Sequence, residues 1–93
     1  MHETLDELMA VLQDRKANPV EGSYTCKLLS AGDTRILKKI GEEASEVIIA
    51  GALEGEERLL SETADLLYHL SVMLVSRDLT WADVEAELAR RRH

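Results

Sequence analysis

The sequence predicts an all-α protein, and three observations lead to that prediction. Apolar residues make up 45% of the 93 residues, but only three residues, one Trp and two Tyr, are aromatic. A core supplied by Leu, Ile, Val and Ala favours helices over a β-sandwich. The apolar residues recur at helical spacing, and no segment alternates as a strand would. We therefore expect a helical bundle around two long antiparallel helices, completed by homodimerisation.

Length and charge limit the classes of protein to which the chain can belong. Ninety-three residues suit a single domain, residues 1–93, with a core small enough for oligomerisation to help. The formal net charge is −7 and the only basic run is the terminal "RRRH", so we expect no nucleic-acid partner. No apolar run approaches the roughly 18 residues of a membrane span. The single Cys26 suits a reducing compartment, so we expect a cytoplasmic protein without membrane association.

The first third of the chain is expected to hold two helices joined by a loop. Residues 2–17 ("HETLDELMAVLQDRKA") repeat apolar residues with a helical period and end before Asn18 and Pro19. Residues 18–25 contain the only proline and are typical of a loop. A short helix over residues 24–32 is expected to be closed by Gly32.

Two long helices and a last short one are expected to follow. Asp33 should cap the first long helix, which runs to about Glu54 and is stopped by Gly55. The second long helix covers residues 56–78. Thr80 and Asp83 have the spacing of a capping box, which predicts a last helix over residues 81–92.

A helical wheel of the first long helix places carboxylates beside its core stripe. The expected stripe comprises Ile36, Ile40, Ala44, Val47 and Gly51. Glu43 and Glu46, three residues apart, are neighbours on one flank of this stripe. Lys39 lies between them in angle, one turn earlier. Glu42 points further round, nearly opposite the core.

The second long helix is apolar nearly all round. Its expected core face comprises Leu59, Leu66, Leu67, Leu70, Met73 and Leu74. Val72 and Val75 lie on the back of this helix and Ile49 lies away from the stripe of the first, so we expect these three to approach a second subunit. The narrow polar stripe that remains comprises Glu62, Asp65, His69 and Ser76. A helix of this kind is buried on more than one side, so its two carboxylates are expected in an internal groove.

Carboxylates that meet across the two helices would repel one another. Two like charges about 4 Å apart repel by about 4 kcal/mol at an effective dielectric constant near 20. Since a domain is stable by only about 5–15 kcal/mol, either some carboxylates are protonated or a divalent cation neutralises them. The expected ligands are Glu43, Glu46, Glu62 and Asp65. Four oxygen ligands favour Mg²⁺, or Mn²⁺, over Zn²⁺, although carboxylates that simply face water would need no cation.

An acidic motif and three longer segments resemble a known family. The segments "EEASE" and "ETAD" have the form of the MazG-like superfamily of all-α nucleoside triphosphate pyrophosphohydrolases. More narrowly, the chain resembles phosphoribosyl-ATP pyrophosphohydrolases of histidine biosynthesis in "GSYT", "KKIGEEASE" and "ADLLYHL", and over about residues 5–91 as a whole. The resemblance implies Mg²⁺-dependent hydrolysis of the α–β phosphoanhydride of phosphoribosyl-ATP, and a homodimer. Members are often fused to phosphoribosyl-AMP cyclohydrolase, so a functional link to that enzyme is expected.

Roles for the individual side chains follow from their charge and position. The expected catalytic residues are Glu42, Glu43 and Glu46. Lys39 shares the flank of the ligands and is the preferred contact with the substrate phosphates, with Lys38 and Lys27 as weaker candidates. Tyr24 is expected either to contact the substrate or to pack. Glu42 has three open roles, as a general base, as an outer support for the ligands or as a solvated side chain, and its angle favours the second.

Two other functions fit the acidic motif. A house-cleaning pyrophosphohydrolase acting on surplus or non-canonical nucleotides would carry the same carboxylates. A non-enzymatic helical oligomerisation module is the alternative if the carboxylates face solvent and bind no metal.

Overall fold

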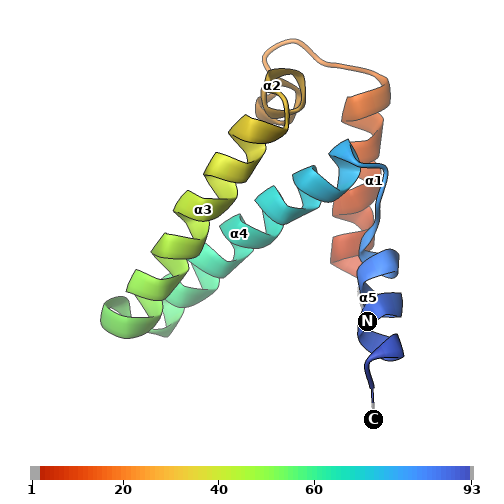
Figure 1. Cartoon of the computed structure of the whole chain (residues 1–93). Helices are drawn as coiled ribbons and strands as arrows, with labels where there is room; N and C mark the ends of the chain where they lie inside the picture. Colours follow the sequence, from red (N-terminus) through yellow and green to blue (C-terminus); the bar gives the residue numbers. More distant parts are fainter. Residues whose placement is uncertain (1–2, 93) are drawn as a thin grey trace.

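The computed structural model describes residues 3–92 and shows only helices and their connections over that range (Figure 1). The elements are α1 (Glu3–Ala17), α2 (Tyr24–Ala31), α3 (Asp33–Ile49), the π-helical turn η1 (Ala50–Glu54), α4 (Glu56–Ser76) and α5 (Trp81–Arg90). The predicted all-α class is therefore confirmed for the described residues, while the predicted start of the first helix at residue 2 lies outside them. No helix within residues 3–92 combines the length and apolar character needed to cross a membrane.

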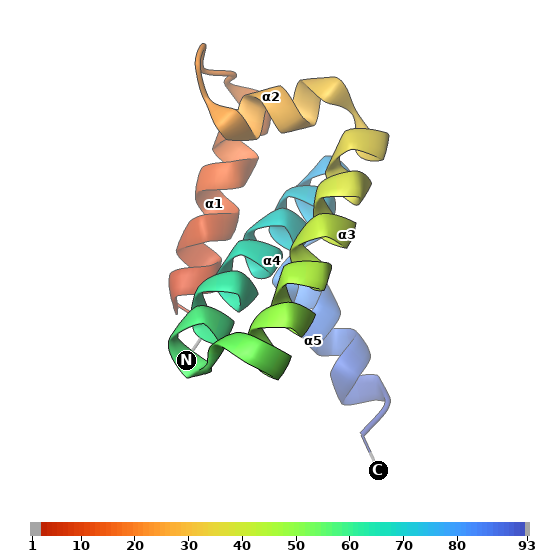
Figure 2. The same ribbon diagram turned by 90° about the vertical axis from the view of Figure 1, so that its left-hand side faces the viewer.

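The two long helices, α3 and α4, form a hairpin. Gly55 ends η1 with a φ of 91°, a left-handed conformation that glycine adopts without strain, and this lets the chain reverse. Figures 1 and 2 show α4 running back along α3. The predicted stop at Gly55 and the antiparallel pair are confirmed, and the reversal brings the acidic segments of the two helices together.

The start of α3 differs from the prediction. Asp33 is the first helical residue, and Gly32, with a φ of 93°, occupies the capping position without a side-chain hydrogen bond. The expected Asp33 cap is therefore wrong. The Asp33 carboxylate accepts hydrogen bonds from Arg77 Nε (2.7 Å) and Ser76 Oγ (3.2 Å), because the packing of α3 on α4 offers it stronger donors than its own backbone.

The core lies where α1, α2 and the start of α3 meet the second half of α4. Its buried apolar residues are Met9, Leu12, Leu28, Ile36, Val72 and Val75. The expectation that Val72 and Val75 approach a second subunit is therefore wrong, since they are 0% and 2% exposed within one chain. The physical reason is that α1 packs on that side of α4, which a wheel of α4 alone does not reveal.

The opposite, leucine-rich side of α4 is only partly covered. Every member of the expected core face of α4 is half-buried, and two of them, Met73 and Leu74, pack against the core; the others are Leu59, Leu66, Leu67 and Leu70. Leu37 and Ile48 of α3 are 53% and 70% exposed, and Leu60 of α4 is 73% exposed. We call these three residues, with the half-buried leucines of α4, the hairpin face. A single chain therefore leaves much of the apolar surface of the hairpin face exposed to solvent.

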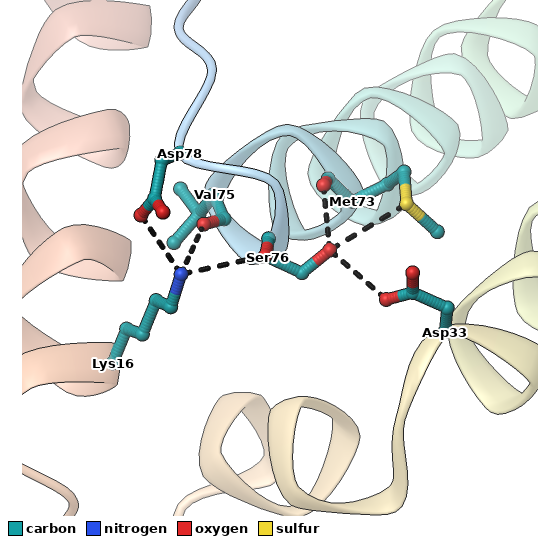
Figure 3. A network of polar contacts seen from close by, with 6 residues as sticks. All are labelled: Lys16, Asp33, Met73, Val75, Ser76 and Asp78. Carbon is teal, nitrogen blue, oxygen red and sulfur yellow. Dashed lines mark hydrogen bonds and ion pairs between the residues drawn. The ribbon is translucent and has the colours of Figure 1, made fainter.

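Lys16 of α1 forms hydrogen bonds with the end of α4 and with Asp78 beyond it. Its ammonium donates hydrogen bonds to the backbone oxygens of Val75 (3.2 Å) and Ser76 (3.3 Å) and to Oδ1 of Asp78 (2.8 Å), as Figure 3 shows. The last carbonyls of a helix lack helical donors and carry partial negative charge, so a cation is favourable there. This contact holds the core-forming half of α4 in register with α1.

The last helix begins with the predicted capping box of Thr80 and Asp83. Trp81, the first residue of α5, packs against the core, and its indole Nε1 donates to Oγ of Ser71 at 2.8 Å. Ser71 is fully buried and donates in turn to the backbone oxygen of Leu67, so the indole finds a satisfied polar partner inside the protein.

Candidate metal centre

Three carboxylates of the hairpin converge at one place. Glu43 on α3 and Glu62 and Asp65 on α4 each offer an oxygen, and these oxygens lie within 4.8 Å of one another. Glu43 and Glu62 are buried, at 8% and 5% exposure, whereas Asp65 is exposed. The spacing of three residues puts Glu62 and Asp65 on one side of α4, and the reversal at Gly55 turns that side toward Glu43. We call these three residues the acidic group.

Each buried carboxylate of the acidic group has one oxygen without a partner. Oε2 of Glu43 and Oε2 of Glu62 are buried and accept no hydrogen bond from the described residues. An unsatisfied buried polar atom costs about 1–3 kcal/mol, and more when it is charged. Hard divalent cations take oxygen ligands of this kind. The residues present therefore fit a divalent cation held between the two helices.

The other oxygen of each buried carboxylate is paired with a basic side chain. Nζ of Lys39 lies 3.5 Å from Oε1 of Glu43, and Nη2 of Arg58 donates to Oε1 of Glu62 at 2.5 Å. In both pairs the basic residue precedes the carboxylate by four residues, which places the two side chains on the same face of the helix. Within residues 3–92, basic side chains thus neutralise part of the charge of the acidic group, at its two buried members.

Lys39 is held in its charged form. Burial would lower the pKa of the Lys39 ammonium, but the nearby Tyr24, Glu42 and Glu43 oxygens outweigh it and raise the pKa above its ordinary value. The ammonium also lies 3.4 Å from Oε1 of Glu42, which is itself exposed. Lys39 is therefore a permanent cation beside the acidic group at neutral pH.

Glu46 lies beside the acidic group and is not part of it. Its side chain is exposed and, with Glu62, lines a cavity of about 200 Å³ that is completed by Ile49, Glu54 and Arg58. Glu46 follows Glu43 by three residues and so lies about 60° further round α3, and it is not among the carboxylates whose oxygens come together. Of the four expected ligands, the structure brings three together and places Glu46 at the adjoining cavity.

Tyr24 is linked to α4 through His69. The Tyr24 hydroxyl lies 2.9 Å from Nε2 of His69, and Nδ1 of the same ring lies 2.8 Å from the backbone oxygen of Asp65. His69 is 6% exposed, whereas Tyr24 is 46% exposed. The first residue of α2 is thereby held next to the acidic group with an open side toward solvent.

The remaining expected phosphate contacts lie further out. Lys38 and Lys27 are both exposed, and neither has a described ion pair with the acidic group. Lys27 lines a shallow cavity with Tyr24 and Arg35 on the outside of α2. Among the expected basic residues, the structure therefore brings only Lys39 to the carboxylates.

Arg58 is the site residue that sequence reasoning missed. Its spacing of four residues from Glu62 is visible in the sequence, but such pairs are common on exposed helices and usually contribute little. Only the burial of Glu62 distinguishes this pair from a surface one.

Comparison of the sequence with known proteins finds a family and several relatives. The family "Phosphoribosyl-ATP pyrophosphohydrolase" matches residues 5–92. A "Phosphoribosyl-ATP pyrophosphatase" of Limosilactobacillus fermentum is 53% identical over 87 residues, covering 94% of this chain and 82% of the relative. Proteins of the same name from Clostridium botulinum (49% identity; 95% and 80% coverage) and Methanocella arvoryzae (46%; 99% and 99%) are also similar.

Proposed function

The chain belongs to the phosphoribosyl-ATP pyrophosphohydrolase family, and on that premise we propose that its acidic group is the centre of an active site for phosphoribosyl-ATP. The enzyme hydrolyses the α–β phosphoanhydride and releases phosphoribosyl-AMP and pyrophosphate, an early step of histidine biosynthesis. The observation that carries the site assignment is the pair of buried, unpartnered oxygens on Glu43 and Glu62.

The acidic group would hold Mg²⁺, with Mn²⁺ as an alternative. Glu43, Glu62 and Asp65 would each contribute a carboxylate oxygen, and Glu46 would complete the set from the adjoining cavity. A divalent cation bound there would supply the positive charge that attracts a polyphosphate and would acidify the attacking water. Both unpartnered oxygens support this role, because they are the acceptors that the chain leaves unused.

Lys39 is the basic residue that pairs with Glu43 in the site. Held charged between Glu42 and Glu43, its ammonium would contact a phosphate oxygen of the substrate and favour departure of the pyrophosphate. Glu42, which touches Lys39 from the exposed side, would orient this ammonium. Lys38 and Lys27 would contribute only to the positive electrostatic potential around the substrate.

A second copy of the chain would cover the hairpin face. Leu37, Ile48 and Leu60 are more than half exposed in one chain and adjoin the half-buried leucines of α4. A two-fold axis would pack two such faces together and extend the small core of each chain. The active unit would then be a homodimer of two hairpins, each chain forming one domain over residues 1–93.

Further partners and the compartment follow from the reaction. Phosphoribosyl-AMP is the substrate of the cyclohydrolase to which family members are often fused, so we propose a functional link to that enzyme. Cys26 is a free thiol, which suits the reducing cytoplasm.

One assay tests the proposed function. Purified protein is incubated with phosphoribosyl-ATP or with ordinary dNTPs, each with Mg²⁺ and with EDTA, and pyrophosphate release is measured. We expect Mg²⁺-dependent release from phosphoribosyl-ATP. Preferred cleavage of dNTPs would indicate a house-cleaning enzyme, and no cleavage together with no metal binding would indicate an oligomerisation module.

A further inference from the structure

Arg58 has two partners on α4 and η1 and remains largely accessible. Its Nη2 donates to Oε1 of Glu62 at 2.5 Å, and its Nε lies 3.9 Å from Oε1 of Glu54. The Arg58 side chain is 56% exposed, whereas that of Glu62 is 7% exposed. A half-exposed guanidinium therefore neutralises a buried carboxylate, and a second carboxylate lies 3.9 Å away.

The cavity that Arg58 lines has an excess of negative charge. Glu46, Glu54 and Glu62 surround the same space of about 200 Å³, and among the described residues that line it Arg58 alone is basic. A divalent cation on Glu62 would approach the guanidinium as a like charge and would remove the reason for the Arg58–Glu62 contact. Arg58 binds Oε1 of Glu62 and a cation would bind the unpartnered Oε2, so the repulsion between the two positive charges favours release of Arg58 once the cation is bound.

We propose that Arg58 is an exchangeable counter-ion of this site, which pairs with Glu62 in the metal-free protein and binds a substrate phosphate when a divalent cation takes its place. The proposal rests on the proposed function. A released guanidinium stays within one side-chain length of Glu62, and hence of phosphate oxygens drawn to a cation there. Its planar donors match phosphate oxygens in pairs, which an ammonium does not offer.

Lys39 does not meet the same conditions. Its side chain is 25% exposed and lies between Glu42 and Glu43, so it keeps a carboxylate partner when Glu43 is drawn toward a cation. A cation bound to Glu62 would weaken the main contact of Arg58. The contact that Arg58 would keep, at 3.9 Å to Glu54, is weak, so Arg58 is the basic residue of the site that can be released.

Titration with Mn²⁺ in the absence of substrate tests the first half of the exchange. Arg58→Ala removes the competing cation, so we expect Mn²⁺ to bind about fivefold more tightly than to the wild-type chain. Arg58→Lys keeps a positive charge and should bind nearly as the wild type does. Arg90→Ala is the matched control, because Arg90 also pairs with a glutamate of its own helix, Glu87, but on the exposed surface of α5.

Steady-state kinetics at saturating Mg²⁺ test the second half. Arg58→Ala should raise KM for phosphoribosyl-ATP by about tenfold or more through loss of a charge-assisted phosphate contact, and Arg58→Lys should restore only part of this. Tighter metal binding combined with weaker substrate binding in one variant is the signature of an exchange. A residue that only stabilised the fold would not produce it.

The outcomes separate the two proposals. If the wild-type chain binds Mn²⁺ and cleaves phosphoribosyl-ATP but Arg58→Ala matches it in metal affinity or in KM, the exchange is overturned and the proposed function stands. If the wild-type chain binds no divalent cation, the metal site fails and the exchange fails with it.

Discussion

The hydroxyl of Tyr24 donates a hydrogen bond to Nε2 of His69, and the two atoms are 2.9 Å apart. The direction follows from the other ring nitrogen, which lies 2.8 Å from the backbone oxygen of Asp65. A carbonyl oxygen only accepts, so Nδ1 carries a proton, and in that tautomer Nε2 is the acceptor. The outward side of the Tyr24 hydroxyl therefore presents lone pairs and suits a hydrogen-bond donor, not a phosphate oxygen.

Replacing Tyr24 by Phe tests this link between α2 and the acidic group. Tyr24→Phe leaves Nε2 of His69 unpaired in a buried position, so we expect a loss of about 1 kcal/mol in the free energy of unfolding and a three- to tenfold lower kcat/KM, both about the size of one hydrogen bond. Urea denaturation and pyrophosphate release measure the two effects. Wild-type values in both would show that the hydroxyl does not position the site.

Glu43→Gln should nearly abolish turnover and leave the fold intact. The substitution keeps the shape of the side chain but removes the charge of a buried carboxylate that has one unpartnered oxygen. Metal affinity should fall with activity, while the thermal midpoint without metal stays equal or rises slightly.

Glu42→Gln is the matched comparison. Glu42 is exposed and contacts Lys39 alone among the described ion pairs, so its loss should weaken activity and preserve the dependence on metal. An inactive Glu42→Gln beside an active Glu43→Gln would show that the ligands are misassigned.

Mg²⁺ should raise the thermal midpoint of the wild-type chain. A ligand that binds only the folded state at about 100 times its Kd adds about 2.7 kcal/mol, which corresponds to about 11–22 °C for a domain of this size. Glu62→Gln should lose most of the shift. Equal shifts in the two proteins, measured against EDTA, would place the bound ion elsewhere.

The ion pair between Asp33 and Arg77 predicts a dependence of stability on pH. The hydrogen bond from Arg77 lowers the pKa of the Asp33 carboxyl below its ordinary value of about 3.9. Its contribution to stability is therefore present above that value and is lost as pH falls through the lower pKa of the folded state. Asp33→Asn should be less stable than the wild type near neutral pH, and the difference should shrink in acid. A difference that is the same at every pH would contradict the role of the charge.

The hairpin face predicts a dimer that one charge can break. Ile48 is 70% exposed in a single chain, so Ile48→Glu should not disturb the monomer fold, but it would bury an unpaired charge in the two-fold contact. We expect the dimer Kd to rise by about 100-fold or more in sedimentation velocity. Leu88→Glu, at a 62% exposed position of α5, is the control and should remain dimeric. A monomeric wild-type chain at micromolar concentration would refute the dimer.

Local sequence signals were enough to predict the helices, the reversal at Gly55 and the capping box of Thr80 and Asp83. These features depend on residues within a few positions of one another, so periodicity and capping signals suffice. The spacing of Glu62 and Asp65, which places both on one side of α4, was predictable for the same reason. So was the family, whose segments stand in order along the chain.

The apolar side of α4 that forms the core and the carboxylates that meet could be identified from the packing of the helices alone. Val72 and Val75 are buried because α1 packs on that side. Glu46 lies outside the group of Glu43, Glu62 and Asp65 because of how α3 is rotated against α4. Arg58 could be recognised as a site residue only because its partner, Glu62, is buried. Contacts between helices depend on the rotation of each about its axis, and a pattern within one helix carries no information about the rotation of its neighbour.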